Sequence, residues 1–124
     1  MKTHNIEKAP AAIGPYSHAV QAGDFFFCSG QTPLDPATMQ LVGDNIQDQT
    51  RRVFENIKIV LDGLGLSLDN VVKTTVFLKT MDDFEGMNGV YAATFGDHKP
   101  ARTTIAVRQN PLDALVEIEC VAVK

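Results

Sequence analysis

The closing run of the chain, residues 115–123, constrains the fold most, because it places charge inside an otherwise apolar strand. Its sequence is LVEIECVAV, and successive side chains of a strand point to opposite faces. One face is wholly apolar and suits packing against helices: Val116, Ile118, Cys120 and Ala122. The other face combines apolar residues with two carboxylates: Leu115, Glu117, Glu119, Val121 and Val123. This second face fits neither open solvent nor the core of a monomer.

The N-terminal half predicts a hairpin followed by a helix. Residues 1–15 contain Pro and Gly and read as an extended arm, and strands are expected at 16–22 and 25–29, joined by a turn at Gly23-Asp24 and ended by Gly30. A loop at 31–43 precedes a helix, for which Asp44 and Gln47 have capping-box spacing. Its apolar positions form one helical face: Val53, Ile57, Val60, Leu61 and Leu64. Gly63 and Gly65 are expected to end this helix.

The C-terminal half predicts three strands and a second helix. Residues 70–79 are rich in β-branched side chains and read as a strand. Asp82 or Asp83 is expected to cap a helix that has one apolar face: Phe84, Met87, Tyr91 and Phe95. Strands are then expected at 102–109 and 115–123, with a turn at 110–113.

The predicted order is β-β-α-β-α-β-β within a single domain, residues 1–124. Helices inserted between strands imply crossovers, so the fold class is α+β, with a mixed sheet and both helices on one face. The uncovered face would expose too much apolar surface for a soluble monomer. We therefore expect a homo-oligomer.

Charge and composition exclude several classes of protein. The formal net charge is −4, which opposes binding to nucleic acid or to an anionic membrane. No apolar run is long enough to span a bilayer, and the start lacks a secretory signal, so a cytoplasmic protein is expected. Cys28 and Cys120 lie in predicted strands without a C-x-x-C motif and are expected to be buried thiols of a reducing compartment.

An arginine and two glutamates are the strongest candidates for chemistry. Arg102 follows Pro100 at a strand entrance, and its guanidinium offers two parallel donors to a carboxylate; the alternative is a surface arginine. Glu117 and Glu119 point the same way, and either could orient a water molecule; the alternative is interface salt bridges. Spacing alone does not choose between the two glutamates.

Several uncharged residues could complete a small-ligand site. Tyr16, Ser29 and Asn88 could hydrogen-bond a ligand, although residues of these types in such positions are more often structural. Gly30 allows close approach to its backbone N–H. Ser29 lacks the G-x-S-x-G context of a nucleophile. The three histidines have no metal-ligand spacing, so no metal site is expected. Positioning of a substrate plus one oriented water requires no cofactor, and none is expected.

Six segments together resemble the Rid family, also called RidA/YjgF or reactive-intermediate deaminases. They are APAAIGPYS at 9–17, SGQTP at 29–33, VKTTVFLK at 72–79, DF at 83–84 with Asn88, PAR at 100–102 and VEIE at 116–119. The resemblance covers essentially the whole chain. It implies a chorismate-mutase-like fold, a homotrimer with a central barrel, and sites at the clefts between subunits.

The resemblance also implies an activity: hydrolysis of 2-imino acids, which arise from enamines released by pyridoxal-phosphate dehydratases, to 2-keto acids and ammonia. Arg102 matches the family's carboxylate-binding arginine. Glu117, and not Glu119, matches the glutamate proposed to act on water. Tyr16, Ser29, Gly30 and Asn88 match pocket positions. Thr104 stands where many members carry a cysteine, which excludes thiol-based chemistry there, although its backbone could still bind ligand.

Two further departures and two rival functions accompany this resemblance. The loop at 96–99 is shorter than in common members, and Asn110 replaces a usual aliphatic residue, which bears on the substrate range. The rivals are a non-catalytic ligand-binding or chaperone-like trimer, and an endoribonuclease. The acidic charge and the missing basic stripe argue against the endoribonuclease.

Overall fold

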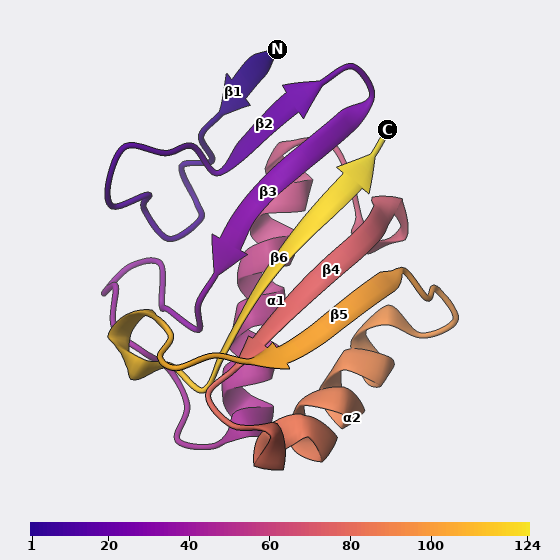
Figure 1. Cartoon of the computed structure of the whole chain (residues 1–124). Coiled ribbons are helices and arrows are strands. Elements are labelled where there is room, and N and C mark those ends of the chain that lie inside the picture. The colour runs from indigo at the N-terminus through magenta and orange to yellow at the C-terminus, as the bar shows by residue number, and fades with distance from the viewer.

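Two helices lie side by side on one face of a six-stranded sheet in the computed structural model, which describes residues 1–124 (Figure 1). The strands and helices in chain order are β1 (Lys2–His4), β2 (Ala19–Ala22), β3 (Phe25–Gln31), α1 (Ile46–Gly63), β4 (Val71–Leu78), α2 (Phe84–Phe95), β5 (Ala101–Ala106) and β6 (Val116–Val123). The predicted α+β class, with a mixed sheet and both helices on one face, is confirmed.

The last strand of the chain lies in the middle of the sheet. The strand order is β1-β2-β3-β6-β4-β5, and every neighbouring pair is antiparallel except β4 and β5. The parallel pair is joined by α2, as a crossover requires. β5 is therefore an edge strand, and only one of its sides is paired.

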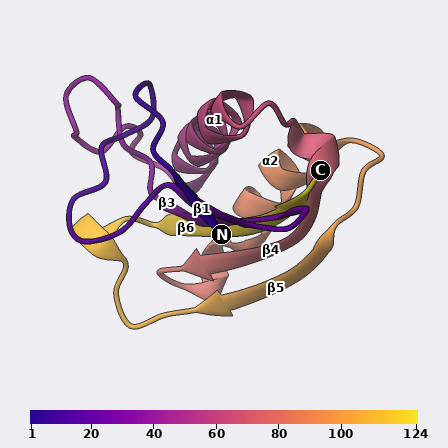
Figure 2. The same ribbon diagram turned by 90° about the horizontal axis from the view of Figure 1, so that it is seen from above.

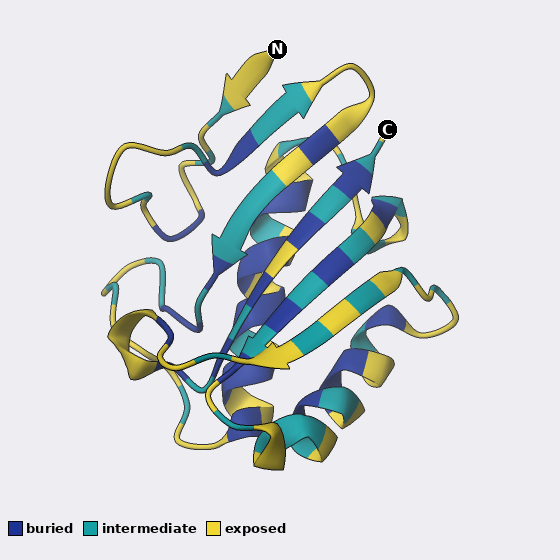
Figure 3. Cartoon of the chain, viewed as in Figure 1, coloured by how far each residue is buried: buried dark blue, intermediate teal, exposed yellow.

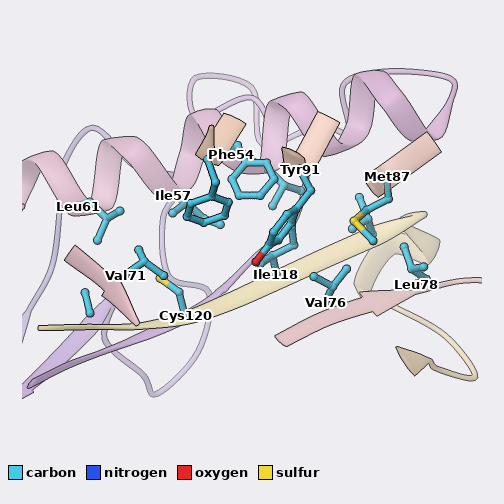
Figure 4. Packing of buried hydrophobic residues seen from close by; sticks show 14 of the residues in the cluster. Phe54, Ile57, Leu61, Val71, Val76, Leu78, Met87, Tyr91, Ile118 and Cys120 are labelled. Carbon is cyan, nitrogen blue, oxygen red and sulfur yellow. The ribbon is translucent and has the colours of Figure 1, made fainter. Parts of the chain in front are cut away.

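The hydrophobic core fills the space between the sheet and the helices. Every second residue of β4 and β6 is buried, which Figure 3 shows as alternating bands along these strands. Figure 4 shows Phe54, Ile57 and Leu61 of α1 facing Ile118 and Cys120 of β6 across this space. The predicted division of β6 is confirmed, since Val116, Ile118, Cys120 and Ala122 are all buried.

Hydrogen bonds, and not the period of the apolar residues, set where helices start and strands end. At these positions the structure differs from the prediction. The N-cap of α1 is Asn45, whose side chain accepts a bond from the Asp48 N–H at 2.8 Å; the predicted Asp44–Gln47 capping box is wrong. Asp83 is the N-cap of α2 by position, but its side chain makes no capping bond.

Strand lengths also differ at the sheet's edges. Three residues of the supposed arm pair with β2 as β1. β3 continues through Gly30 to Gln31 by way of a register shift, so Gly30 does not end it. β5 stops at Ala106, three residues short of the expected end.

The second face of the sheet carries no helix, as the view from above shows (Figure 2). Phe25 and Phe27 of β3 remain 47% and 50% exposed and pair with Val123 and Val121 of β6. Ile105 of the edge strand is also exposed. This half-apolar surface is what motivated the prediction of a homo-oligomer, which stays a prediction.

Candidate functional site

Arg102 lies at the start of the edge strand and is held by α2. Its register partner on β4 is Thr74, which is buried on the helix side of the sheet. The Arg102 Nη1 donates to Asn88 Oδ1 at 2.7 Å. No Asp or Glu forms an ion pair with it, since the ion pairs of the chain involve other residues. The guanidinium is thus oriented by a neutral partner and keeps its full charge.

An aromatic platform supports the same guanidinium. Its central carbon lies 4.6 Å from the centroid of the Tyr91 ring and 5.6 Å from that of Phe84. The Tyr91 hydroxyl in turn shares a 2.7 Å hydrogen bond with the buried Thr74 hydroxyl. Stacking on a fixed ring stabilises an arginine and restricts its rotamers.

The guanidinium borders a hollow between the end of α2 and the start of β5. The hollow has a volume of about 380 Å³, large enough for a small organic acid. Its lining combines aromatic and cationic residues: Tyr91, Ala92, Phe95, Gly96, His98, Lys99, Pro100 and Arg102. None of these carries a negative charge, so the hollow favours an anion.

Glu117 occupies a different place, on the open face of β6. Its register partner is Phe77 of β4. A Cβ atom built on Gly30 would lie only 2.6 Å from Glu117 Oε1, so the carboxylate sits directly against the backbone of β3. Only glycine leaves room for this contact.

Burial raises the pKa of Glu117 above its ordinary value, and the negative charge of nearby Glu119 raises it further. A carboxylate with a raised pKa is a better proton acceptor near neutral pH, because general bases work best when their pKa approaches the operating pH. Glu119 is exposed and lacks this environment. The two glutamates, equivalent by spacing, therefore differ in the folded chain.

The side chains of Arg102 and Glu117 lie on opposite faces of the sheet. Their register partners on β4, Thr74 and Phe77, are three positions apart, and residues an odd number of positions apart on a strand face opposite sides. β4 also lies between β5 and β6, so Arg102 and Glu117 are not on neighbouring strands. One chain alone does not bring these two groups into a shared hollow.

The remaining candidates divide between these two places. Asn88 is bonded to Arg102, and Thr104 lies two residues beyond Arg102 on the same side of β5, with a buried hydroxyl that has no hydrogen-bond partner. Gly30 adjoins Glu117, and Ser29, beside it, donates to Ser17 O at 2.7 Å. Tyr16 is half-exposed in the loop that precedes β2.

The histidines and Asn110 have structural partners. His18 is buried, with Nδ1 accepting from the Ile6 N–H and Nε2 donating to Pro10 O, so it ties the N-terminal segment to the sheet. Asn110 donates to Phe77 O and Ala114 O, which supports the turn before β6. No group of three or more His, Cys, Asp or Glu side chains is placed to hold a metal ion.

Sequence reasoning assigned Tyr91 and Phe84 only to the apolar face of α2 and missed their contact with Arg102. One signal was available: a tyrosine on a buried helical face needs a partner for its hydroxyl. The register of β5 against β4, which places the arginine above this ring, could not be read from spacing.

Comparison with known proteins identifies the family. The model described as Endoribonuclease L-PSP matches residues 6–124, so the chain belongs to this family. It is 53% identical over 118 residues to a RutC family protein of Pyrococcus horikoshii, covering 95% of this chain and 94% of that one. It is 42% identical over 126 residues to the 2-iminobutanoate/2-iminopropanoate deaminase of Salmonella typhimurium, covering 99% and 98%. The resemblance to the Rid family is thereby confirmed.

Solved structures show the same architecture. The crystal structure of the YjgF gene product of E. coli matches with a TM-score of 0.93 and 40% identity, over 100% of this chain and 99% of that one. E. coli TdcF, solved with bound serine, also matches with a TM-score of 0.93, at 38% identity and the same coverage. No helix of the chain has the length and apolar character needed to cross a membrane.

Proposed function

We propose that this protein hydrolyses 2-imino acids to 2-keto acids and ammonia, with Arg102 binding the substrate carboxylate and Glu117 acting on the attacking water. The observation that carries the proposal is the charge of Arg102: it is oriented by Asn88 and Tyr91, unpaired with any carboxylate, and placed in a hollow without negative charge. The deaminase name of the Salmonella relative supports the reaction type.

The proposed site is shared between copies of the chain. Arg102 lies at an edge strand, and Glu117 lies on the uncovered face, so a second copy packed on that face would supply its Glu117 to the first copy's Arg102. Tyr16, Ser29 and Gly30 would enter with Glu117, while Asn88 and Thr104 would stay with Arg102. A closed homotrimer provides three such sites by symmetry.

The reaction requires few groups. The protonated imine carbon is already electrophilic, and the bond between its carboxylate and Arg102 fixes that carbon in place. Water adds to the carbon as Glu117 takes one of its protons, which gives a carbinolamine. Glu117 then returns this proton to nitrogen, and as the C–N bond breaks it accepts the hydroxyl proton of the carbinolamine, so the carbonyl forms and ammonia leaves. Glu117 passes that last proton to the departing ammonia, so the balance is protonated imine plus water to keto acid plus ammonium, and no cofactor takes part.

A non-catalytic ligand-binding protein is the second candidate, because Arg102 and its hollow are complete within one chain and do not need Glu117. Such a protein would bind 2-keto acids without accelerating imine hydrolysis. The endoribonuclease named in the family description is a further rival, and the net charge of −4 opposes it.

The test follows imine decay when a pyridoxal-phosphate threonine dehydratase generates 2-iminobutanoate in the presence of the purified protein. We expect kcat/KM to fall about 10²-fold or more in Arg102→Ala, because a desolvated charge pair is lost. Glu117→Gln is expected to lower kcat by about 10²-fold while 2-ketobutyrate binding persists. Arg108→Ala and Glu119→Gln, which change exposed residues of the same types, should retain activity.

The outcomes separate the three functions. Keto-acid binding that needs Arg102, with no acceleration of hydrolysis by the wild type, would favour the binding protein. Cleavage of RNA that survives Arg102→Ala and repeated purification would favour the endoribonuclease. An Arg102→Ala variant as active as the wild type would exclude the carboxylate clamp.

A further inference from the structure

The two cysteines of the chain face each other across the β3–β6 ladder. Cys28 and Cys120 are direct register partners, and they are the only cysteines among the 124 residues. Both side chains point to the helix side of the sheet, where Cys120 packs beneath α1 near Ile57 and Leu61 (Figure 4). Both thiols are free, and they line the same small space together with Ile57 and Val60 of α1.

The ladder pattern places their backbones at a distance that a disulfide accepts. The Lys124 N–H donates to Asp24 O at 2.9 Å, which makes the 24/124 pair hydrogen-bonded. Bonded and non-bonded pairs alternate along an antiparallel ladder, so the 28/120 pair is of the bonded kind, with Cα atoms about 5.5 Å apart. Disulfides span Cα separations of about 4.4–6.8 Å, which this spacing meets. The Cβ atoms of a hydrogen-bonded pair lie about 5.5 Å apart and must approach to about 4.5 Å or less, so the disulfide would be strained.

The two thiols differ in exposure, at the point where the register of the β3–β6 ladder shifts, between Cys28 and Gln31. Cys28 is partly exposed, whereas Cys120 is only 4% exposed. An oxidant therefore meets Cys28 first, and Cys120 lies behind it as a second thiol held within contact.

We propose that Cys28 and Cys120 form a redox-active dithiol, in which peroxide oxidises Cys28 and Cys120 then closes an intramolecular disulfide between β3 and β6. The assignment of roles follows from position. The interaction with Cys120 lowers the pKa of Cys28, while the same interaction and burial raise the pKa of Cys120. The thiolate is the form that reacts with peroxide.

The chemistry balances with hydrogen peroxide as the oxidant. The Cys28 thiolate attacks one peroxide oxygen, the O–O bond breaks, and hydroxide leaves, which gives a sulfenic acid on Cys28. The Cys120 sulfur then attacks the Cys28 sulfur and displaces its hydroxyl group as water. In sum, two thiols and one peroxide give one disulfide and two water molecules.

The proposed link joins the two strands that carry Gly30 and Glu117, and it does not depend on the function proposed above. A thiol buffer would reverse it, because a disulfide strained by the spacing of a hydrogen-bonded cross-strand pair is of the labile kind. The pair would then report the redox state of its surroundings, in contrast to a permanent structural crosslink.

The experiment treats the reduced, desalted full-length protein with hydrogen peroxide and analyses it by intact mass and non-reducing peptide mapping. We expect a loss of about 2 Da per chain, no remaining free thiol under denaturing conditions, and one peptide pair linked through Cys28 and Cys120. Dithiothreitol should restore both thiols. In Cys120→Ala, Cys28 is expected to accumulate a sulfenic acid that dimedone traps, and in Cys28→Ala, Cys120 should remain unmodified.

Three results would overturn the proposal. These are a Cys28 that proceeds to sulfinic acid while Cys120 stays a thiol, a disulfide that joins two separate chains, and two thiols that both survive treatment. Peptide mapping of the peroxide-treated wild-type protein distinguishes these results from the expected disulfide. The conclusion therefore does not depend on whether the Cys120→Ala variant, altered at a buried residue, folds.

Discussion

Glu117 is a residue whose burial costs the folded chain stability when its carboxyl group is charged. Burial in the open face of the sheet raises its pKa above 4.5, its ordinary value, and the charge of Glu119 adds to this. The folded chain therefore holds this proton more tightly than the unfolded chain. By linkage, the stability associated with the proton is fully present below the ordinary pKa and is lost as the pH rises through the raised pKa.

Glu117→Gln should accordingly stabilise the protein at pH 7 and not at pH 4, because glutamine has no charge to bury. Thermal unfolding between pH 4 and pH 8 measures this as a difference in Tm between variant and wild type that grows with pH. Glu119→Gln is the control and should show a smaller gain, since burial is the larger cause of the shift. A Tm difference that does not change with pH would contradict the assignment.

Arg102 and Tyr91 show what residue-level reading of the sequence can and cannot reach. The arginine could be singled out because a lone permanent cation stood at a strand entrance. The orientation of the Arg102 side chain could not be predicted, because it depends on the register of β5 against β4. It also depends on a hydrogen bond between Tyr91 and Thr74, which are 17 positions apart. The same register determines which candidate site residues lie on each face of the sheet, so this division could not be predicted either.

Helix α2 contains two glycines, Gly86 and Gly89. Helix propensity alone predicts the same gain in stability when either is replaced by alanine, but the two positions pack differently. A Cβ on exposed Gly89 would meet nothing within 4 Å, whereas a Cβ on Gly86 would lie 2.5 Å from Ile46 Cγ2. Gly89→Ala should therefore stabilise the chain by about 1 kcal/mol, the cost of glycine in a helix interior. Gly86→Ala should destabilise it by about 1–2 kcal/mol through overpacking. Urea unfolding tests this, and equal effects of the two substitutions would contradict the α1–α2 packing.

The elements themselves were largely predictable because they depend on local patterns. The apolar face of α1 and the two faces of β6 follow from periods of 3.6 and 2 residues. β1 was not predictable, because three residues with little apolar character become a strand only by pairing with β2. The position of β6 between β3 and β4 could likewise not be predicted, since it depends on which strands pair and not on the residues within each strand.

The whole molecule leaves an apolar sheet face that another copy is expected to cover. Phe27 lies near the middle of this face and is half-exposed; burying such a side chain contributes about 1.5–3 kcal/mol, repeated at each interface of an oligomer. Phe27→Glu should leave the protein as separate 13.5 kDa chains and abolish the proposed hydrolysis of 2-imino acids. Met81→Glu, which alters an exposed residue on the helix side, should leave the assembly intact. Sedimentation of the wild type as a monomer would contradict the expectation.

A mixing experiment tests most directly whether the working site joins Arg102 of one chain to Glu117 of another. Arg102→Ala and Glu117→Gln chains are produced together so that they assemble into common trimers, and imine hydrolysis is compared with that of each variant alone. A shared site restores activity to about one quarter of the wild-type value, because random assembly pairs an intact arginine with an intact glutamate in that share of the clefts. Activity no greater than the average of the two separate variants would show that the two residues do not meet across the interface.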